Sequence, residues 1–160
     1  MPNLKKAEEI VREFFEKMTF EVEVEVLPVV EGVLPVRIKT EEPQILIGQG
    51  GETLSEIQRL LRIILRKQLV EEFYLDLDIN DYKKKKAEYL REVAKEAADQ
   101  VALTKQDREL EPMSAYERRI IHTEIASRPD VISESVGEGS DRRIVIKPAS
   151  GATESRPAAE

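Results

Sequence analysis

Two short groups of residues have the types and spacing needed to hold a negatively charged ligand. The first is Gly48-Gln49-Gly50-Gly51, which lies between a short apolar segment and an apolar-stepped helical pattern. A Gly-x-x-Gly turn between helices exposes the N–H groups that begin the second helix, and a phosphate can approach closely because side chains are missing. The alternative is a tight interhelical turn that needs φ > 0 and binds nothing.

The second group is the pair Arg118 and His122, which are four residues apart in the sequence. They project from nearly the same face of a helix whose start is marked by the capping box Ser114-Ala115-Tyr116-Glu117. A guanidinium forks onto a phosphate, and a nearby imidazole can donate a second hydrogen bond. A phosphate partner would favour the charged form of His122. The alternative makes both residues structural, with Arg118 paired to a neighbouring glutamate and His122 packed among isoleucines.

Further basic residues lie close to these two groups. The run Lys83-Lys84-Lys85-Lys86 falls in the first turn of a predicted helix, where cations oppose the helix dipole. Fold stability does not require that placement, whereas a polyanion would benefit from it; a solvated charge run is the alternative. Arg59, Arg62 and Arg66 share one flank of the helix after the glycines, either as a phosphate track or as a solvated face paired with Glu52 and Glu56.

Composition limits the chemistry that the chain can perform. Its 160 residues include no Cys and a single His, which leaves no thiolate nucleophile, disulfide framework or multi-histidine metal site. The net charge is −7, with 10 basic and 17 acidic residues over 4–81 but 7 and 4 over 82–106. Global charge therefore predicts weak non-specific attraction to nucleic acid. The absence of Trp and the 5% aromatic content argue against an aromatic stacking platform.

Hydrophobic periodicity predicts the elements that position these residues. The helices are expected at 4–18, at 54–68, from a cap at Asn80 or Asp81 to about 101, and from Ser114 to about 127. The strands are expected at 20–26, 33–40, 73–79, 131–136 and 142–147, the last two forming a hairpin. Pro35 suggests an edge strand or the end of a ladder. No apolar run is long enough for a membrane span.

The segment around the glycines resembles the KH signature. Residues 45–58 contain apolar residues, an Ile-Gly-x-x-Gly turn and an apolar-stepped helix, and the element order resembles the bacterial, type II form of that fold. The resemblance implies that the turn clamps the backbone of about four nucleotides. Many KH turns carry Lys or Arg at a middle position, where this chain has Gln49 and Gly50.

The segment from Glu111 to His122 resembles the R-three-H domain, which is named for its Arg-x-x-x-His helix and is associated with single-stranded nucleic acid. The following hairpin, with Arg142 and Arg143, fits that fold. A KH-like module directly followed by such a module resembles the Jag (SpoIIIJ-associated) family of bacterial RNA-binding proteins. The resemblance covers residues 4–147 and does not include the separate amino-terminal domain common in that family.

These observations together predict an α+β protein without enzymatic activity. We expect a type II KH-like domain (αββααβ) at 4–80, an R-three-H-like domain with helices packed on a short β-sheet at 81–147, and a disordered tail at 148–160. The expected function is cytoplasmic binding of single-stranded RNA, as a post-transcriptional regulator without cofactor, metal or membrane association. The alternatives are a single-stranded DNA binder, a protein-assembly scaffold with a KH-domain protein as partner, and a nuclease that uses His122 as its acid or base. The expected RNA-binding residues are Gly48, Gln49, Gly50, Gly51, Arg59, Arg62, Lys83, Lys84, Arg118, Arg119, His122 and Arg142.

Overall fold

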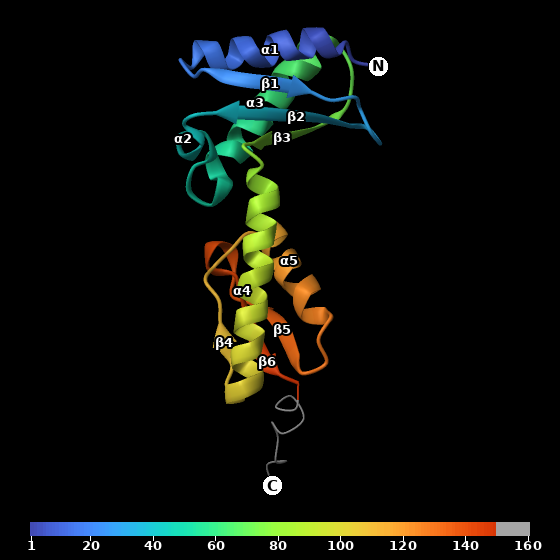
Figure 1. Cartoon of the computed structure of the whole chain (residues 1–160). Helices are drawn as coiled ribbons and strands as arrows, with labels where there is room; N and C mark the ends of the chain where they lie inside the picture. The colour runs from blue at the N-terminus through green and yellow to red at the C-terminus, as the bar shows by residue number, and fades with distance from the viewer. Residues whose placement is uncertain (150–160) are drawn as a thin grey trace. The chain divides into compact units, whose positions relative to one another are not determined.

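The chain folds into two compact units, each with its own β-sheet and helices (Figure 1). A computed structural model describes residues 1–149. The first unit is Met1–Lys83, and the second unit begins at Lys84. Among residues 1–149, no helix is long and apolar enough to cross a membrane.

The first unit has the αββααβ order that the sequence predicts. Its elements are α1 (Leu4–Lys17), β1 (Val22–Val26), β2 (Val33–Thr40), α2 (Pro43–Ile47), α3 (Glu52–Leu69) and β3 (Tyr74–Ile79). A single 3₁₀ turn, Gln49–Gly51, separates α2 from α3. The expected type II KH-like arrangement is confirmed, and the short apolar segment before the glycines is a helix of five residues.

The three strands form a sheet in the order β1-β2-β3, with β1 antiparallel and β3 parallel to the central strand β2. Burial alternates along β2, so one face of the sheet carries the core and the other is open. The expectation of an edge strand from Pro35 is wrong, because β2 is central. The end-of-ladder alternative holds only toward β1, where the last pair is Val26–Val36 and the N–H of Leu27 donates to the carbonyl of Pro35; toward β3, Pro35 lies within the ladder and pairs with Asp76.

The core of the first unit is made by α1 and α3 against the buried face of the sheet. The buried residues of α3 repeat every three or four positions, as the sequence periodicity predicts. They are Leu54, Ile57, Leu61 and Leu65. This packing fixes the axis of α3, and therefore fixes where its first turn presents the glycine segment.

The turn from β3 into the long helix α4 (Tyr82–Thr104) differs from the expectation. Asn80 and Asp81 do not cap the helix; both have positive φ, 49° and 56°. The side chain of Asn80 instead makes two hydrogen bonds to the backbone of Thr40, at 3.0 and 2.9 Å. The buried carboxylate of Asp78 accepts from the N–H of Lys83, 3.2 Å away, so the strand itself supplies the acceptor that starts the helix.

The second unit contains α4 from Lys84 onward, followed by β4 (Arg108–Glu109), α5 (Ala115–Ala126), β5 (Val131–Val136) and β6 (Arg143–Pro148). The antiparallel sheet has the order β4-β6-β5, with a short 3₁₀ turn, Gly139–Asp141, between β5 and β6. The predicted hairpin and the predicted capped helix are confirmed. The two-residue strand β4 is not predicted by any alternation in the sequence.

Helices α4 and α5 share one hydrophobic core with the sheet of the second unit, through Ile121, Ile125, Ile144 and Ile146 among others. Strand β6 extends to Pro148, which pairs with Val131, so this residue belongs to the sheet and not to the tail expected from 148. The N–H of Ala149 donates to the carbonyl of Asp130, 3.0 Å away, and the rest of the expected tail, residues 150–160, lies outside the described residues.

Candidate nucleic-acid interface

The glycine turn has a backbone conformation that other residues adopt with difficulty. Gly48, Gly50 and Gly51 all have positive φ, at 71°, 62° and 82°. A Cβ at Gly48 would lie 2.2 Å from Oγ1 of Thr53, and one at Gly51 would lie 3.0 Å from the ring of Tyr82. At Gly50 a Cβ would meet nothing within 4 Å. Close packing against Thr53 therefore requires glycine at position 48, whereas Gly51 lies close to the Tyr82 ring and Gly50 lies at an open surface.

The turn also presents backbone donors. The N–H of Gly48 donates to Gln44 and that of Gly51 to Gly48. Within residues 1–149, the N–H groups of Gln49 and Gly50 donate no hydrogen bond, and both residues are exposed. Two free donors ahead of an 18-residue helix with its positive dipole end make a surface that can bind an anion.

The arginines of α3 differ in what they already contact. Arg66 donates from Nε to the carbonyl of Phe73, 3.2 Å away, and so helps hold α3 against the start of β3. In the described part of the chain, Arg59 and Arg62 have no hydrogen bond or ion pair. Arg59 lies on the rim of an apolar groove that also includes Phe14 and Leu60. These two arginines are free to contact a ligand, whereas Arg66 has a structural role.

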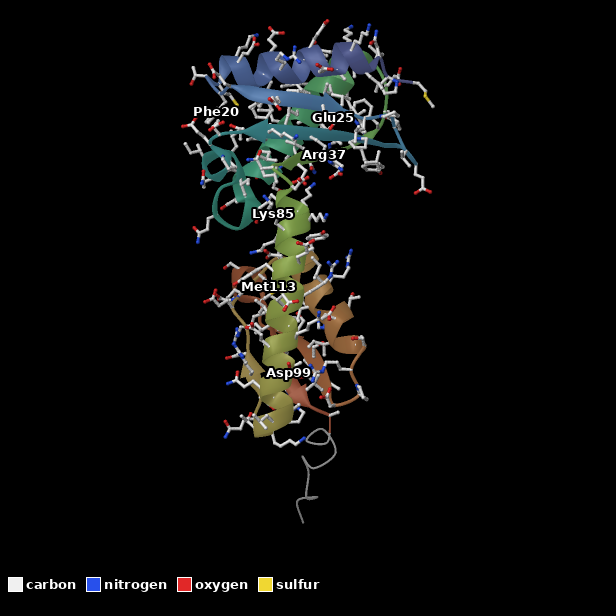
Figure 2. All side chains as sticks on the ribbon, in the orientation of Figure 1. Phe20, Glu25, Arg37, Lys85, Asp99 and Met113 are labelled. Atoms are coloured by element: carbon white, nitrogen blue, oxygen red, sulfur yellow. The ribbon has the colours of Figure 1, made fainter. Side chains whose placement is uncertain are left out.

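The first lysine of the run is used by the fold. Nζ of Lys83 lies 2.6 Å from Oδ1 of Asp76, and Arg37, which is labelled in Figure 2, donates from two nitrogens to Oδ2 of the same carboxylate. Burial raises the pKa of the Asp76 carboxyl, but the hydrogen bonds and charges of Lys83 and Arg37 outweigh burial and hold this pKa below its ordinary value. Lys83 therefore balances charge on the open face of the sheet, and a phosphate would compete with Asp76 for it.

The other three lysines belong to the second unit. Lys84 and Lys85 are exposed and form no ion pair within residues 1–149; Lys85 is labelled on α4 in Figure 2. Lys86 lies 3.5 Å from a carboxylate oxygen of Glu117 and 5.5 Å from the centre of the Tyr89 ring. The run thus contains two free cations between two that are engaged.

Helix α5 begins with the expected capping box. The N–H of Glu117 donates to Oγ of Ser114 at 3.3 Å, and the N–H of Ser114 donates to the Glu117 carboxylate at 2.8 Å. Arg118 then donates from Nη1 to the carbonyl of Met113, 2.6 Å away, in the segment just before the helix (Met113 is labelled in Figure 2). Within residues 1–149, Arg118 makes no ion pair with Glu111 or Glu117, the neighbouring glutamates of the structural alternative. Its remaining N–H groups are available to an anion.

His122 lies one turn after Arg118 and contacts strand β5. Its Nδ1 is 2.7 Å from Oγ of Ser133. Burial of the ring, and then the charge of Arg118, hold the pKa of His122 below its ordinary value. Without a ligand the imidazole is therefore neutral near pH 7, so the permanent positive charge at this position belongs to Arg118 alone.

The hairpin adds one arginine to this group and directs the other elsewhere. Arg142 donates from Nε to Oγ of Ser135 at 2.9 Å, and its carbonyl accepts from the N–H of Met113 at 3.1 Å. Arg143 instead forms an ion pair of 2.6 Å with Glu109 on β4. Arg119 is exposed, with no ion pair in the described part of the chain.

Two serines complete this group, and neither was among the residues predicted from the sequence. Ser133 and Ser135 oppose Ile146 and Ile144 across the β5–β6 ladder, and those isoleucines are buried beneath the helices. The serines therefore lie on the helix-covered face, at positions where alternation predicts apolar residues. Polar residues at positions of β5 where alternation predicts apolar ones were the only signal in the sequence that these two serines have a specific role. We use the name α5 cluster for Arg118, His122, Ser133, Ser135 and Arg142.

Comparison with known proteins places the α5 cluster inside a recognised domain. The family model of the R-three-H domain matches residues 88–148. The RNA-binding protein KhpB of Clostridium symbiosum is 34% identical over 142 residues, which is 88% of this chain and 64% of that protein. KhpB of Bacillus subtilis (strain 168) is 34% identical over 111 residues, 68% of this chain and 53% of that protein. KhpB of Streptococcus pneumoniae serotype 2 (strain D39) is 33% identical over 111 residues, 69% of this chain and 34% of that protein.

The chain belongs to the Jag (KhpB) family. It spans between about a third and two thirds of the length of these relatives. Within this Jag family chain, the R-three-H match contains every member of the α5 cluster, whereas Lys83–Lys86 precede it.

Proposed function

We propose that the chain is a cytoplasmic protein that binds single-stranded RNA without chemistry and acts as a post-transcriptional regulator. The observation that carries this proposal is the α5 cluster, where a guanidinium with unused donors lies beside a fixed imidazole and a second arginine. The relatives in the Jag family are named RNA-binding proteins, which supports RNA as the ligand.

In the second unit, Arg118 is the principal phosphate contact. Its bond to the Met113 carbonyl orients the guanidinium and leaves the other donors for a phosphate fork. Arg142 is linked to the same segment, because its carbonyl accepts from the N–H of Met113. Arg119 and Lys84 extend the positive surface as exposed cations. Arg118 and Arg142 are thus oriented by the same short segment before α5.

In the first unit, the backbone clamps the RNA. The free N–H groups of Gln49 and Gly50 meet a phosphate, and the packed glycines Gly48 and Gly51 hold the turn in the shape that presents them. Arg59 and Arg62 supply positive charge on α3, within a unit whose overall charge is negative. Binding by this unit therefore depends on contact geometry more than on long-range attraction.

The nuclease alternative has less support. Oγ of Ser133, and not a carboxylate, orients the His122 imidazole. Among residues 1–149, no group of three His, Asp or Glu side chains could hold a metal ion. Because a lone neutral imidazole without an acidic partner or a metal provides limited acid–base catalysis, binding without cleavage is the simpler function.

The test measures RNA affinity as a function of salt. Fluorescence anisotropy with an unstructured 20-nucleotide RNA, between 50 and 200 mM salt, should give a dissociation constant that weakens as salt rises. With about three phosphates neutralised, the slope of log K against log salt should be about −2. The variants Arg118→Ala and Gln49→Asp should each bind several-fold more weakly. Arg12→Gln, which removes an exposed charge from α1, is the matched control and should bind like the parent. No detectable complex at micromolar protein in low salt would refute RNA binding.

A second candidate function is assembly with a KH-fold protein partner, and one surface feature favours it. Helix α3 exposes a stripe at spacings of four, three and four residues: Glu56, Leu60, Ile63 and Lys67. Leu60 and Ile63 are 49% and 56% exposed, and they line a groove of about 380 Å³ together with Phe14 and Met18. Packed antiparallel on its own copy, this stripe would place Leu60 against Ile63 and Glu56 against Lys67. The stripe is self-complementary, so the simplest partner is a second copy of this unit.

Sedimentation velocity of the purified chain tests this second function. A dimer that Leu60→Asp converts to monomer supports it. Glu56→Lys should weaken the dimer, and the added change Lys67→Glu should restore it, because the swapped pair has the same complementarity. A monomer at 100 μM protein would refute the self-association, and RNA binding would be unaffected by that result.

A further inference from the structure

The two ring nitrogens of His122 have different environments. Nδ1 is engaged by Oγ of Ser133 at 2.7 Å. Nε2 has no hydrogen-bond partner within residues 1–149. No side-chain nitrogen or oxygen in that part of the chain is both buried and unpartnered, so Nε2 is not fully buried. The fold therefore fixes the ring through one nitrogen and offers the other to a ligand.

At this surface Arg118 supplies the charge, and the neutral imidazole of His122 supplies a hydrogen-bonding group. Arg118 stands one turn earlier on α5 and supplies the positive charge of this surface. The imidazole is kept neutral, first by burial and then by the charge of Arg118. A phosphate oxygen that approaches this surface is attracted mainly by the guanidinium. His122 is then left to contact an uncharged group next to that phosphate.

The ribose 2′-hydroxyl is an uncharged group that can hydrogen-bond Nε2 in either neutral tautomer of the imidazole. A neutral imidazole donates from one nitrogen and accepts at the other, and the Ser133 hydroxyl can satisfy Nδ1 in either tautomer. Nε2 is correspondingly an acceptor or a donor. A phosphate oxygen can meet only the donor form, whereas a 2′-hydroxyl both donates and accepts and so meets both.

We propose that Nε2 of His122 hydrogen-bonds a ribose 2′-hydroxyl next to the phosphate held by Arg118, so that His122 makes the chain select RNA over DNA. Ser133 is the positioning residue that sets the ring. This inference rests on the proposed function, because it assigns the selectivity of the same surface. It differs from the expectation that His122 adds a second phosphate contact.

The experiment compares two oligonucleotides that differ only at the 2′ position, a 15-nucleotide oligouridine and the corresponding oligodeoxyuridine. Anisotropy at pH 7.5 gives the ratio of RNA to DNA affinity for the full chain. His122→Ala should lower that ratio by about three- to tenfold, as expected for one neutral hydrogen bond, with little change in DNA affinity. Comparing ratios between parent and variant cancels any selectivity that resides in the first unit.

Two further variants test the positioning role. Ser133→Ala should lower the ratio part of the way, because the ring loses its anchor, and Ser133→Thr should restore it, because the hydroxyl returns. Thr123→Ala is the matched control: it removes a hydroxyl next to His122 whose bond is to the carbonyl of Arg119, and it should leave the ratio unchanged. Thermal unfolding of each variant shows that the compared proteins are folded.

The outcomes separate the two proposals. If the parent chain binds neither oligonucleotide, the RNA-binding function itself fails, and the selectivity fails with it. If the parent binds RNA and folded His122→Ala keeps the same ratio, the function stands and the 2′-hydroxyl contact is wrong. Equal losses of RNA and DNA affinity in His122→Ala would also overturn the inference, because they indicate a phosphate or base contact.

Discussion

Replacing Gly48 should destabilise the first unit far more than replacing Gly50, although both belong to the same turn. Gly48 has φ 71° and ψ −177°, a region that only glycine occupies readily. Holding another residue there costs about 1–3 kcal/mol. In addition, a Cβ would lie 2.2 Å from Oγ1 and 2.8 Å from Cβ of Thr53, and overpacking of that kind costs about 1–3 kcal/mol. Gly48→Ala should therefore lower the free energy of unfolding by about 2–6 kcal/mol.

Gly50 provides the comparison within the same turn. Its φ and ψ of 62° and 16° are left-handed helical, and a Cβ would meet no atom within 4 Å. Gly50→Ala should therefore cost only about 1 kcal/mol, the penalty for the left-handed conformation alone. The difference between the two variants isolates the contact with Thr53 from the general preference of the turn for glycine.

Urea unfolding monitored by circular dichroism measures both variants on the same scale. Thr53→Ala in the Gly48→Ala background should recover part of the loss, because it removes Oγ1 but leaves Cβ at 2.8 Å. Equal destabilisation by Gly48→Ala and Gly50→Ala would refute the reasoning, since it would mean that Thr53 moves aside at no cost. The same result would remove the argument that Gly48 is present for packing as well as for ligand approach.

Three further outcomes follow from the second unit. Ser114→Ala should lower the free energy of unfolding by about 1 kcal/mol, measured by urea unfolding, because the N–H of Glu117 loses its acceptor. Arg118→Ala should weaken RNA binding by about 1.5–3 kcal/mol in anisotropy, and Arg118→Lys should restore only part, because an ammonium cannot fork; full restoration would show that only charge matters. The folded-state pKa of His122 lies below 6.5, so the unfolded chain binds more protons below that pH. The contribution of neutral His122 to the free energy of unfolding is therefore complete above pH 6.5 and is lost as the pH falls through the folded-state pKa of His122. Thermal melts at pH 7.5 and 5.5 should show a smaller acid destabilisation in His122→Gln than in the parent, and an equal loss in both would contradict the lowered pKa.

The order of the elements and the two main motifs were predictable because each depends on a local pattern. Alternation in 22–26 and the apolar steps of α3 identify elements whose burial is decided by their own sequence. The capping box at Ser114 needs only residues three apart, so it marked the start of α5 correctly. The spacing of Arg118 and His122 likewise predicts that they share a helix flank. The charge of Arg118 helps to lower the pKa of His122, as expected for two side chains on one flank.

The contacts of the basic residues were not predictable, because they depend on residues distant in the sequence. Lys83 was expected at the interface, yet its partner Asp76 comes from β3. Asn80 was expected to cap a helix, yet it bonds to Thr40 across the sheet, 40 residues away. Arg142 and Arg143 are adjacent in the sequence, but Arg142, the residue before β6, donates to Ser135, whereas Arg143, the first residue of β6, pairs with Glu109. A sequence shows which cations are available, and the tertiary partners determine which of them remain free.

Because tertiary partners determine which cations remain free, a chain with a net charge of −7 can still have a surface suited to RNA. Several cations that composition would count as phosphate contacts are neutralised internally, including Lys83 by Asp76 and Arg143 by Glu109. The α5 cluster is different, because Arg118 and Arg142 are oriented by an uncharged carbonyl and a hydroxyl and keep their full charge. A cation held by neutral partners is pre-organised without being neutralised, so it costs little entropy to engage a phosphate and meets no competing carboxylate. Selectivity for a particular strand would then come from short-range hydrogen bonds such as the one we propose for His122, because the acidic remainder of the chain weakens attraction to any polyanion that does not make them.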